Sequence, residues 1–384
     1  MPATLPLKHQ AADTTIFTVM STLAQEHQAI NLSQGFPDFP LEGALTDLLR
    51  EAAVSGFNQY APMPGLPQLR ESIALDLQRR YGLAVDPLLE ITVTPGATYA
   101  IYTALAALLQ PGDEVIILEP AYDSYIPNIE MLGAVPVPVA LQAPHFRVDW
   151  ELLKAAISPA TKAILVNTPH NPTGTTWTPE DWLQLAELVR DTDIVIVSDE
   201  VYEQLVYDGG THSSVLQLPE LRERSFALYS FGKVFHNTGW KVGYCIAPPA
   251  YTRAFRRLHQ FLAFSVNTPA QYALAQYLQQ EREPVQYMMQ AKRDHFLQLM
   301  QQTPFKPLTP AAGSYFQLMS YEGLSQLDEH SYARLLTTRY GVAAIPVSAF
   351  YTNRNDQKLL RFCFAKKEAT LEAAAERLRS VQPE

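Results

Sequence analysis

The fold of this chain is decided by the stretch ITVTPGATYAIYTALAALLQPGDEVIIL at residues 91–118. Its two ends, 91–94 and 115–118, are short apolar runs rich in β-branched residues, which is typical of buried strands. Between them, residues 99–109 have the composition of a helix, and the breaker QPG at 110–112 ends it. The stretch therefore predicts two parallel strands joined by a covering helix.

The same alternation continues to about residue 250. Further short apolar runs lie at 163–166, 194–197, 226–229 and 242–246. A helix is expected at 179–190, because Thr178 can cap it and Pro179 suits the first helical position. Six strands with helical crossovers predict an α/β fold, in which a mostly parallel central sheet carries helices on both faces.

The pattern changes after about residue 285. The sequence then predicts a long helix at 285–302, a strand at 315–319, a helix ending near Gly341, two more strands and a last helix at 368–381. This order indicates a smaller α+β domain. We therefore expect three parts: an N-terminal arm that joins the small domain (1–45), a large domain (46–284) and a C-terminal small domain (285–384).

Charge and composition limit the classes of partner. The 384 residues carry a formal charge of -10, which disfavours binding to nucleic acid or to an anionic membrane and favours a small-molecule substrate. Residues 1–15 lack the apolar core of a signal peptide, and no apolar run is long enough to span a bilayer, so we expect a cytoplasmic protein. Cys245 and Cys363 lie in apolar runs and are expected to be inert core thiols, with no metal site.

The motifs of several common enzyme classes do not occur in the sequence, among them GxGxxG, HExxH and GxSxG. Polar residues instead follow the carboxyl ends of the predicted strands, where open α/β sheets place their ligands. They are the segment 95–98, Tyr122, Asn171, Asp199, Tyr202, Ser230 and Lys233. We expect one cleft to contain them all.

Four stretches around these residues are similar to the site motifs of one enzyme family. They are NPTG at 171–174, SDEVY at 198–202, SFGK at 230–233 and TGWKVG at 238–243. In order and spacing they resemble the class I aminotransferases of the fold-type I superfamily, which use pyridoxal 5'-phosphate (PLP), and the likeness covers about residues 17–378. QGFPDF at 34–39 and SVNTP at 265–269 are similar to the branch of kynurenine aminotransferase (glutamine transaminase K) and bacterial methionine aminotransferases.

The resemblance implies roles around the cofactor. Lys233 is implied to form the Schiff base and to act as general base and acid. Asp199 is implied to keep the pyridine nitrogen protonated, Asn171 and Tyr202 to donate to the phenolate oxygen, and Tyr122 to stack on the ring. Without the resemblance, Asp199 is equally well explained as a helix N-cap, and Tyr122 as an aromatic side chain that fills the core.

The resemblance also implies how the phosphate group is held. The residues concerned are Gly96, Ala97, Thr98, Ser230, Lys241 and, from a neighbouring subunit, Tyr60. Because Tyr60 is implied to cross between subunits, the expected active unit is a homodimer.

Substrate binding is implied to depend on Arg361. It lies in the apolar run 359–365, where an arginine needs an anionic partner. The resemblance makes that partner the substrate α-carboxylate, bound with help from Asn171 and the backbone of Gly35, and an internal salt bridge is the alternative. Aromatic candidates for the side-chain pocket are Phe17, Tyr60, Tyr99 and Phe350.

The activity implied by the resemblance is transfer of an amino group from a neutral amino acid to a 2-oxo acid, through pyridoxamine phosphate. No second arginine aligns with the one that binds dicarboxylates in aspartate aminotransferases, so methionine is the first candidate donor, followed by phenylalanine, tyrosine, histidine, glutamine or kynurenine. A cysteine S-conjugate β-lyase on the same lysine is the alternative. A non-catalytic sensor is a remote alternative, because it requires a fused DNA-binding domain and the chain is acidic.

Overall fold

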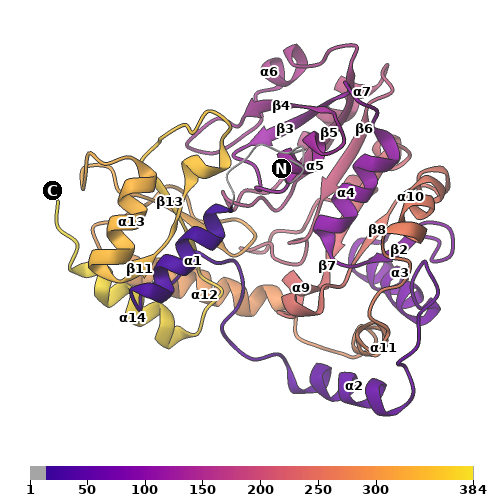
Figure 1. Cartoon of the computed structure of the whole chain (residues 1–384), viewed down its shortest axis with the longest axis horizontal. Coiled ribbons are helices and arrows are strands. Elements are labelled where there is room, and N and C mark those ends of the chain that lie inside the picture. Colours follow the sequence, from indigo (N-terminus) through magenta and orange to yellow (C-terminus); the bar gives the residue numbers. More distant parts are fainter. Residues whose placement is uncertain (1–13, 384) are drawn as a thin grey trace, which may run out of the picture.

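The computed structural model describes residues 14–383, and within them a seven-stranded sheet has the order β2-β8-β7-β6-β5-β3-β4 (Figure 1). The strands are β2 (Ile91–Thr94), β3 (Glu114–Glu119), β4 (Val135–Ala140), β5 (Thr161–Asn167), β6 (Val195–Asp199), β7 (Ser225–Ser230) and β8 (Gly243–Ile246). Strand β8 runs antiparallel to both neighbours, and the other pairs are parallel. The α/β fold with a mostly parallel sheet and the six predicted strands are therefore confirmed.

Strand β4 is the member of the sheet that the sequence pattern did not predict. Its sequence is VPVPVA, with Pro136 and Pro138 at alternate positions, and proline in a run normally argues against a strand. The strand lies at the sheet edge and pairs with β3 alone. An edge strand leaves one row of N–H groups without a ladder partner, so proline is tolerated there.

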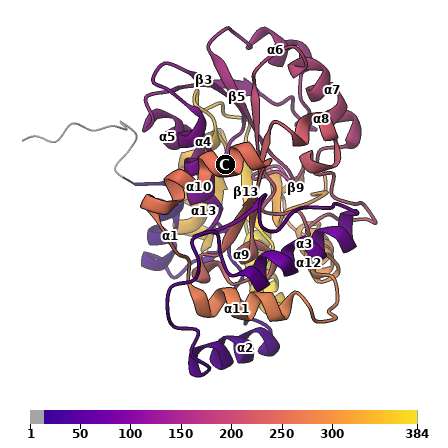
Figure 2. The same ribbon diagram turned by 90° about the vertical axis from the view of Figure 1, so that its right-hand side faces the viewer.

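Helices cover both faces of the sheet, because successive side chains of each strand point to opposite sides. In β3, Val115 and Ile117 face a cluster with α4 (Ala97–Leu108), α5 (Tyr125–Glu130) and α10 (Pro249–Leu262). Ile116 and Leu118 face the opposite cluster. The helices on that side are α3 (Pro67–Tyr81), α7 (Pro179–Val189) and α11 (Thr268–Tyr277). Helix α2 (Gly43–Val54) lies beside α11 (Figure 2).

The predicted start of α7 is confirmed in detail. Thr178 accepts a hydrogen bond from the N–H of Asp181, and the Asp181 carboxylate accepts one from the N–H of Thr178, which completes a capping box. Pro179 is the first helical residue, as expected.

A second core brings the two ends of the described chain together (Figure 1). It contains α12 (Val285–Met300), α13 (Glu329–Tyr340), α14 (Glu368–Arg379) and a four-stranded sheet of β12 (Ile345–Pro346), β13 (Leu359–Cys363), β10 (Phe316–Ser320) and β9 (Lys306–Pro307). Helix α1 (Ile16–Glu26) packs on it, and β1 (Ile30–Asn31) pairs in parallel with β11 (Val342–Ala343). The boundaries near residues 45 and 285 stay a prediction. Residues 1–13 of the expected arm, and residue 384, lie outside the described residues.

Two further expectations concern the thiols and the membrane. Cys245 and Cys363 are both buried and unpaired, in agreement with the prediction. Burial raises the pKa of each thiol, which makes both poor nucleophiles. Among the helices of residues 14–383, none has the length and apolar character needed to cross a membrane.

Candidate active site

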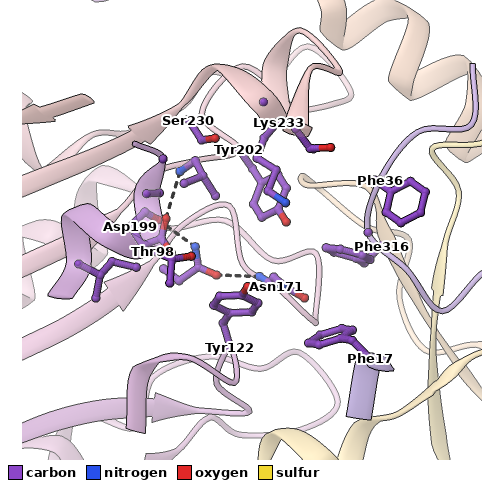
Figure 3. A pocket seen from close by; sticks show the side chains of 18 of the residues that line it. Phe17, Phe36, Thr98, Tyr122, Asn171, Asp199, Tyr202, Ser230, Lys233 and Phe316 are labelled. Carbon is purple, nitrogen blue, oxygen red and sulfur yellow. Dashed lines mark hydrogen bonds between the residues drawn. The ribbon is translucent and has the colours of Figure 1, made fainter. Parts of the chain in front are cut away.

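A cavity of about 320 Å³ lies where the carboxyl ends of the parallel strands meet the smaller core (Figure 3). Most residues expected at the site line it: Phe17, Gly35, Gly96, Ala97, Thr98, Tyr122, Asn171, Asp199, Tyr202, Ser230, Lys233, Lys241 and Arg361. They come from segments more than 300 residues apart in the sequence, and the fold brings them together. Figure 3 shows Asp199 and Thr98 on one side and the rings of Phe17, Phe36 and Phe316 on the other.

Three of the expected residues do not line this cavity: Tyr60, Tyr99 and Phe350. Tyr60 is 83% exposed and its ring contacts Phe264. The hydroxyl of Tyr99 is 2.9 Å from Nδ1 of His259, so it is already engaged. Phe350 is buried behind Phe17, at 5.9 Å between ring centroids. The substrate and cofactor roles expected of these residues stay predictions.

One end of the cavity is a cradle for an anion. Helix α4 begins at Ala97, and its N-cap Gly96 has φ 83° and gives no side-chain cap. A Cβ at Gly96 would come within 3.3 Å of the Lys241 Nζ, so the glycine lets this ammonium approach the helix start. Ser230 occupies the N-cap position of the short helix α9 (Phe231–Val234), which also borders the cavity, and its hydroxyl makes no capping hydrogen bond. Free N–H groups at a helix start, a hydroxyl and an ammonium together fit a phosphate group.

Asp199 ends β6 and is 4% exposed. Its Oδ2 accepts a hydrogen bond of 2.6 Å from the Tyr125 hydroxyl, and its Oδ1 accepts a longer one of 3.3 Å from the N–H of Val201. Burial raises the pKa of this carboxyl to about 6, although these donors and the Lys233 charge oppose the rise. The carboxylate therefore has capacity for another strong donor.

Lys233 lies on α9, with its Nζ 5.9 Å from the centroid of the Tyr202 ring. Burial lowers the pKa of this lysine to about 8, while Asp199 opposes the change and the Lys241 charge adds to it. More of the amine is therefore neutral at physiological pH than in an exposed lysine. A neutral amine is the form that attacks a carbonyl carbon.

A chain of hydrogen bonds crosses the floor of the cavity. The Asn167 side chain donates to the backbone carbonyl of Asp199 at 2.8 Å and accepts from the N–H of Asn171 at 2.9 Å. The Asn171 Oδ1 in turn accepts from Nη1 of Arg361 at 2.7 Å. The positions of Asp199, Asn171 and Arg361 are therefore coupled.

Arg361 is fully buried on β13, and its second Nη donates to the carbonyl of Ser33 at 2.7 Å. The guanidinium lies 3.9 Å from the centroid of the Phe316 ring. Burial lowers the pKa of Arg361 to about 10, so the group stays charged at neutral pH. Its Nε has no hydrogen-bond partner among residues 14–383, and the carboxylate whose charge acts on it is that of Asp123. Among the described residues no hydrogen bond joins Arg361 to this carboxylate, and its buried charge fits an external carboxylate as well.

The cavity is also lined by residues to which sequence reasoning assigned no role. Gln34, Phe36, Val201, Gly232, Thr238 and Val242 lie within the motifs quoted for the family, whereas Ile101, Tyr125, Asn167 and Phe316 lie outside them. Asn167 is the last residue of β5, so the rule that polar residues collect at strand ends could have found it. Gln34 donates to the Ser21 hydroxyl at 2.6 Å and so holds α1, which carries Phe17. No pattern in the sequence singles out Phe316, because it resembles any buried strand residue.

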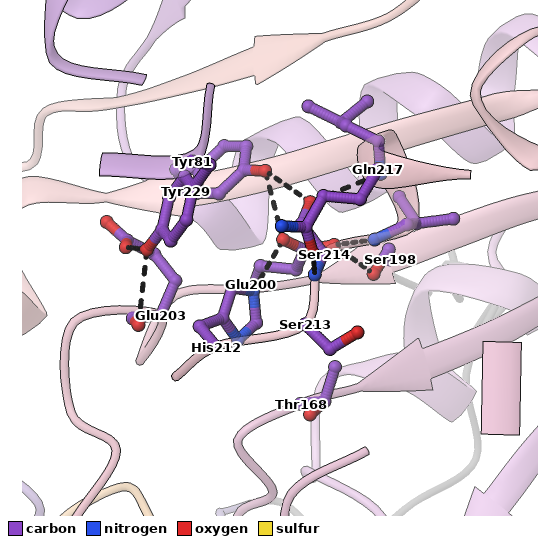
Figure 4. A network of polar contacts seen from close by, with 12 residues as sticks. Tyr81, Thr168, Ser198, Glu200, Glu203, His212, Ser213, Ser214, Gln217 and Tyr229 are labelled. Carbon is purple, nitrogen blue, oxygen red and sulfur yellow. Dashed lines mark hydrogen bonds and ion pairs between the residues drawn. The ribbon is translucent and has the colours of Figure 1, made fainter. Parts of the chain in front are cut away.

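A second polar network surrounds Glu200, directly after β6 (Figure 4). Tyr229 of this network belongs to the core cluster on one face of the sheet, whereas Tyr125, which contacts Asp199, belongs to the cluster on the other face. Glu200 is fully buried and is bound by four donors: Nε2 of His212 at 2.8 Å, the hydroxyls of Ser198 (2.8 Å) and Tyr229 (3.0 Å), and the N–H of Val215 at 3.0 Å. Burial alone would raise the pKa of Glu200, but His212 and the other donors hold it below its usual value.

Comparison with known proteins agrees with this geometry. Residues 27–378 match the family model of class I and II aminotransferases. The chain is 49% identical over 373 residues to the methionine aminotransferase of Escherichia coli, with 96% of each chain covered. It is 36% identical over 394 residues to kynurenine–oxoglutarate transaminase 1 of Homo sapiens, with 93% of each covered.

Among solved structures, an Escherichia coli protein with methionine aminotransferase function has a TM-score of 0.96 and 48% identity, over 98% of this chain and 100% of that one. This match confirms the expected fold-type I architecture, and the family match confirms the resemblance read from the site motifs. The chain therefore belongs to the class I and II aminotransferase family.

Proposed function

We propose that this aminotransferase binds PLP in the cavity and transfers the amino group of a neutral amino acid, with methionine as the first candidate, to a 2-oxo acid. The observation that carries the proposal is that one cavity contains Lys233, Asp199 and Arg361, each with unused bonding capacity. An amine nucleophile, a buried carboxylate and a buried guanidinium are the groups that this chemistry needs.

Each part of PLP finds a complementary group. The cradle of Gly96, Ser230 and Lys241 fits the phosphate, and Asp199 fits a protonated ring nitrogen. Lys233 is the residue whose amine would hold the cofactor and would move the proton at the substrate Cα. When bound, PLP supplies the electron sink that stabilises the carbanion.

The surroundings of Arg361 support a neutral substrate. The cations that line the cavity are Lys233, Lys241 and Arg361, and the proposal already assigns all three. None of the cavity-lining residues then remains to bind a side-chain carboxylate. The rings of Phe17, Phe36 and Phe316 instead offer an aromatic enclosure, which suits a thioether because sulfur packs well against aromatic rings. The Escherichia coli relative named for methionine supports the same choice.

We also propose a homodimer in which Tyr60 reaches the phosphate of the partner subunit. Tyr60 is 83% exposed and Phe261 is 88% exposed, so two large aromatic side chains lie on the surface. Exposed aromatic residues of this size are typical of a subunit interface. A cytoplasmic location stays a prediction.

The proposal is tested by absorbance spectroscopy of the purified protein after incubation with PLP. We expect a bound cofactor that methionine alone converts to the amine form and that an added 2-oxo acid restores. Borohydride reduction followed by peptide mass analysis should find the cofactor on Lys233.

Three outcomes would contradict it. A protein that does not retain PLP has a different cofactor. One that retains PLP but ignores every neutral amino acid has a different substrate class. Release of pyruvate and a thiol from an S-conjugate, with no 2-oxo acid required, would identify a β-lyase.

A further inference from the structure

Tyr125 is the residue in the cavity whose contact with the proposed machinery is shortest and whose role is not yet explained. It is the first residue of α5, is 2% exposed, and lines the cavity three positions after Tyr122. Its hydroxyl donates to Oδ2 of Asp199 at 2.6 Å. Burial raises the pKa of the phenol well above its usual value, so it remains a proton donor throughout the physiological range.

We propose that Tyr125 is a positioning residue that keeps the Asp199 carboxylate ionised and leaves its Oδ1 directed to the ring nitrogen of PLP. This inference rests on the proposed function, because it assumes that PLP is the occupant of the cavity.

The first step of the argument concerns the two oxygens of Asp199. Tyr125 engages Oδ2 at 2.6 Å, whereas Oδ1 has one long contact of 3.3 Å with Val201. The backbone carbonyl of the same residue is held separately by Asn167 and Thr168. The main chain and one oxygen are therefore fixed, and the weakly bound oxygen is the one available to a ligand.

The second step concerns the charge. The titratable groups that face Asp199 are Lys233, Glu200, Tyr122, Tyr125 and Tyr202. Glu200 opposes ionisation of Asp199, and burial opposes it most. Lys233 favours ionisation, but the proposed function uses this amine to attach the cofactor. Tyr125 is then the side chain of the protein that continues to stabilise the carboxylate.

The fold supplies a matched control. Tyr229 also donates to a buried carboxylate, the Oε2 of Glu200, at 3.0 Å. Glu200 keeps three other donors, and Tyr229 does not line the cavity. Both Tyr125→Phe and Tyr229→Phe remove one oxygen atom from a buried ring, so the two variants differ in which carboxylate loses its donor.

The experiment measures the affinity of PLP for the cofactor-free protein as a function of pH. Protonation of Asp199 removes the acceptor for the ring nitrogen, so binding should weaken on the acid side. The pH range in which PLP affinity falls as the solution is acidified is the acid limb of the profile. Removing a donor from a carboxylate raises its pKa, and Tyr125→Phe should therefore shift this acid limb upward by about one pH unit. Tyr229→Phe should leave the limb in place. In the Asp199→Asn background, Tyr125→Phe should have no further effect on PLP affinity.

The outcomes separate this inference from the proposed function. Failure of the wild-type protein to bind PLP would reject the proposed function and this inference with it. Normal wild-type binding, with an acid limb that does not move in Tyr125→Phe, would reject the positioning role alone. Equal shifts in both tyrosine variants would also reject it, because they would indicate a general effect of losing a buried hydroxyl. If Tyr125→Phe also lowers the melting temperature strongly, the Asp199→Asn background still tests the role. A further loss of PLP affinity on adding Tyr125→Phe to that background would reject it.

Discussion

Asp199 is the last residue of β6 and Glu200 follows it, so their carboxylates point to opposite sides: Asp199 lies at the cavity (Figure 3) and Glu200 in the second polar network (Figure 4). Both are buried, with 4% and 0% of their surface exposed. Burial raises the pKa of Asp199 to about 6, whereas the donors around Glu200 hold its pKa below the usual value. Two carboxylates that are buried to a similar degree thus have pKa values shifted in opposite directions.

The difference lies in the number of donors that each carboxylate finds inside the protein. Glu200 has four, including His212, and its network is complete. Asp199 has one short and one long hydrogen bond and opens into a cavity. A complete network stabilises the fold, while an incomplete one costs stability and marks a place prepared for a ligand. Burial alone does not distinguish the two.

The largest expected effect is on catalysis, in Asp199→Asn. The amide cannot hold the ring nitrogen of PLP in its protonated form, and loss of one preorganised electrostatic partner typically costs about 10²- to 10³-fold in rate. We expect kcat/KM for methionine to fall by about that factor at saturating PLP. Steady-state kinetics measures it, with cofactor occupancy checked by absorbance. Wild-type activity in this variant would remove Asp199 from the proposed mechanism.

The same variant should gain stability without the cofactor, and the sign follows from the pKa. The folded pKa of Asp199, about 6, lies above its ordinary value of 3.8, so the folded state binds the proton more tightly than the unfolded state. The stability contributed by that proton is fully present below pH 3.8 and is lost as the pH rises through 6. Relative to wild type, Asp199→Asn should therefore become more stable between about pH 5 and pH 8, by on the order of 1 kcal/mol or more. Urea unfolding at both pH values measures the difference in the free energy of unfolding between the variant and wild type. If this difference did not change with pH, burial would not have raised the pKa of Asp199.

The next largest effect is expected in Glu200→Gln, and it concerns folding instead of catalysis. The variant replaces an oxygen that accepts hydrogen bonds with an NH2 group that accepts none, so buried donors on that side lose their acceptor, at about 1–3 kcal/mol each. We expect the free energy of unfolding to fall by about 3 kcal/mol at pH 7. The protein concentration must be equal in all samples, because the stability of an oligomer depends on it. If the variant instead kept its stability and lost activity as severely as Asp199→Asn, the contrast between the two networks would be wrong.

Sequence reasoning succeeded where local pattern and order along the chain carry the information. The apolar runs predicted β2, β3, β5, β6, β7 and β8, and the polar residues after them are the ones found at the cavity. It failed at β4, because the edge position that tolerates Pro136 and Pro138 is a property of the assembled sheet.

The hydrogen bonds that tune the site were also beyond the sequence. Tyr125 and Asp199 are 74 positions apart, and Arg361 and Asn171 are 190 apart, so no spacing connects the members of either pair. Asp199 and Glu200, conversely, are adjacent and identical in charge. Only the three-dimensional surroundings show that one faces the cavity and the other faces His212.

The smallest expected effect is in Tyr60→Phe. This variant tests whether the exposed Tyr60 hydroxyl completes the cavity of the partner subunit. The Tyr60 ring packs against Phe264 at 5.6 Å, and the substitution keeps this contact while it removes the hydroxyl. If that hydroxyl donates to the phosphate in the partner subunit, PLP should dissociate about tenfold more readily, as expected for one hydrogen bond to a charged group. Equilibrium titration of the cofactor-free dimer measures this, with its mass checked by light scattering. An unchanged dissociation constant in an intact dimer would show that the Tyr60 hydroxyl does not contribute to PLP binding, because neither the ring contact nor the assembly would have changed.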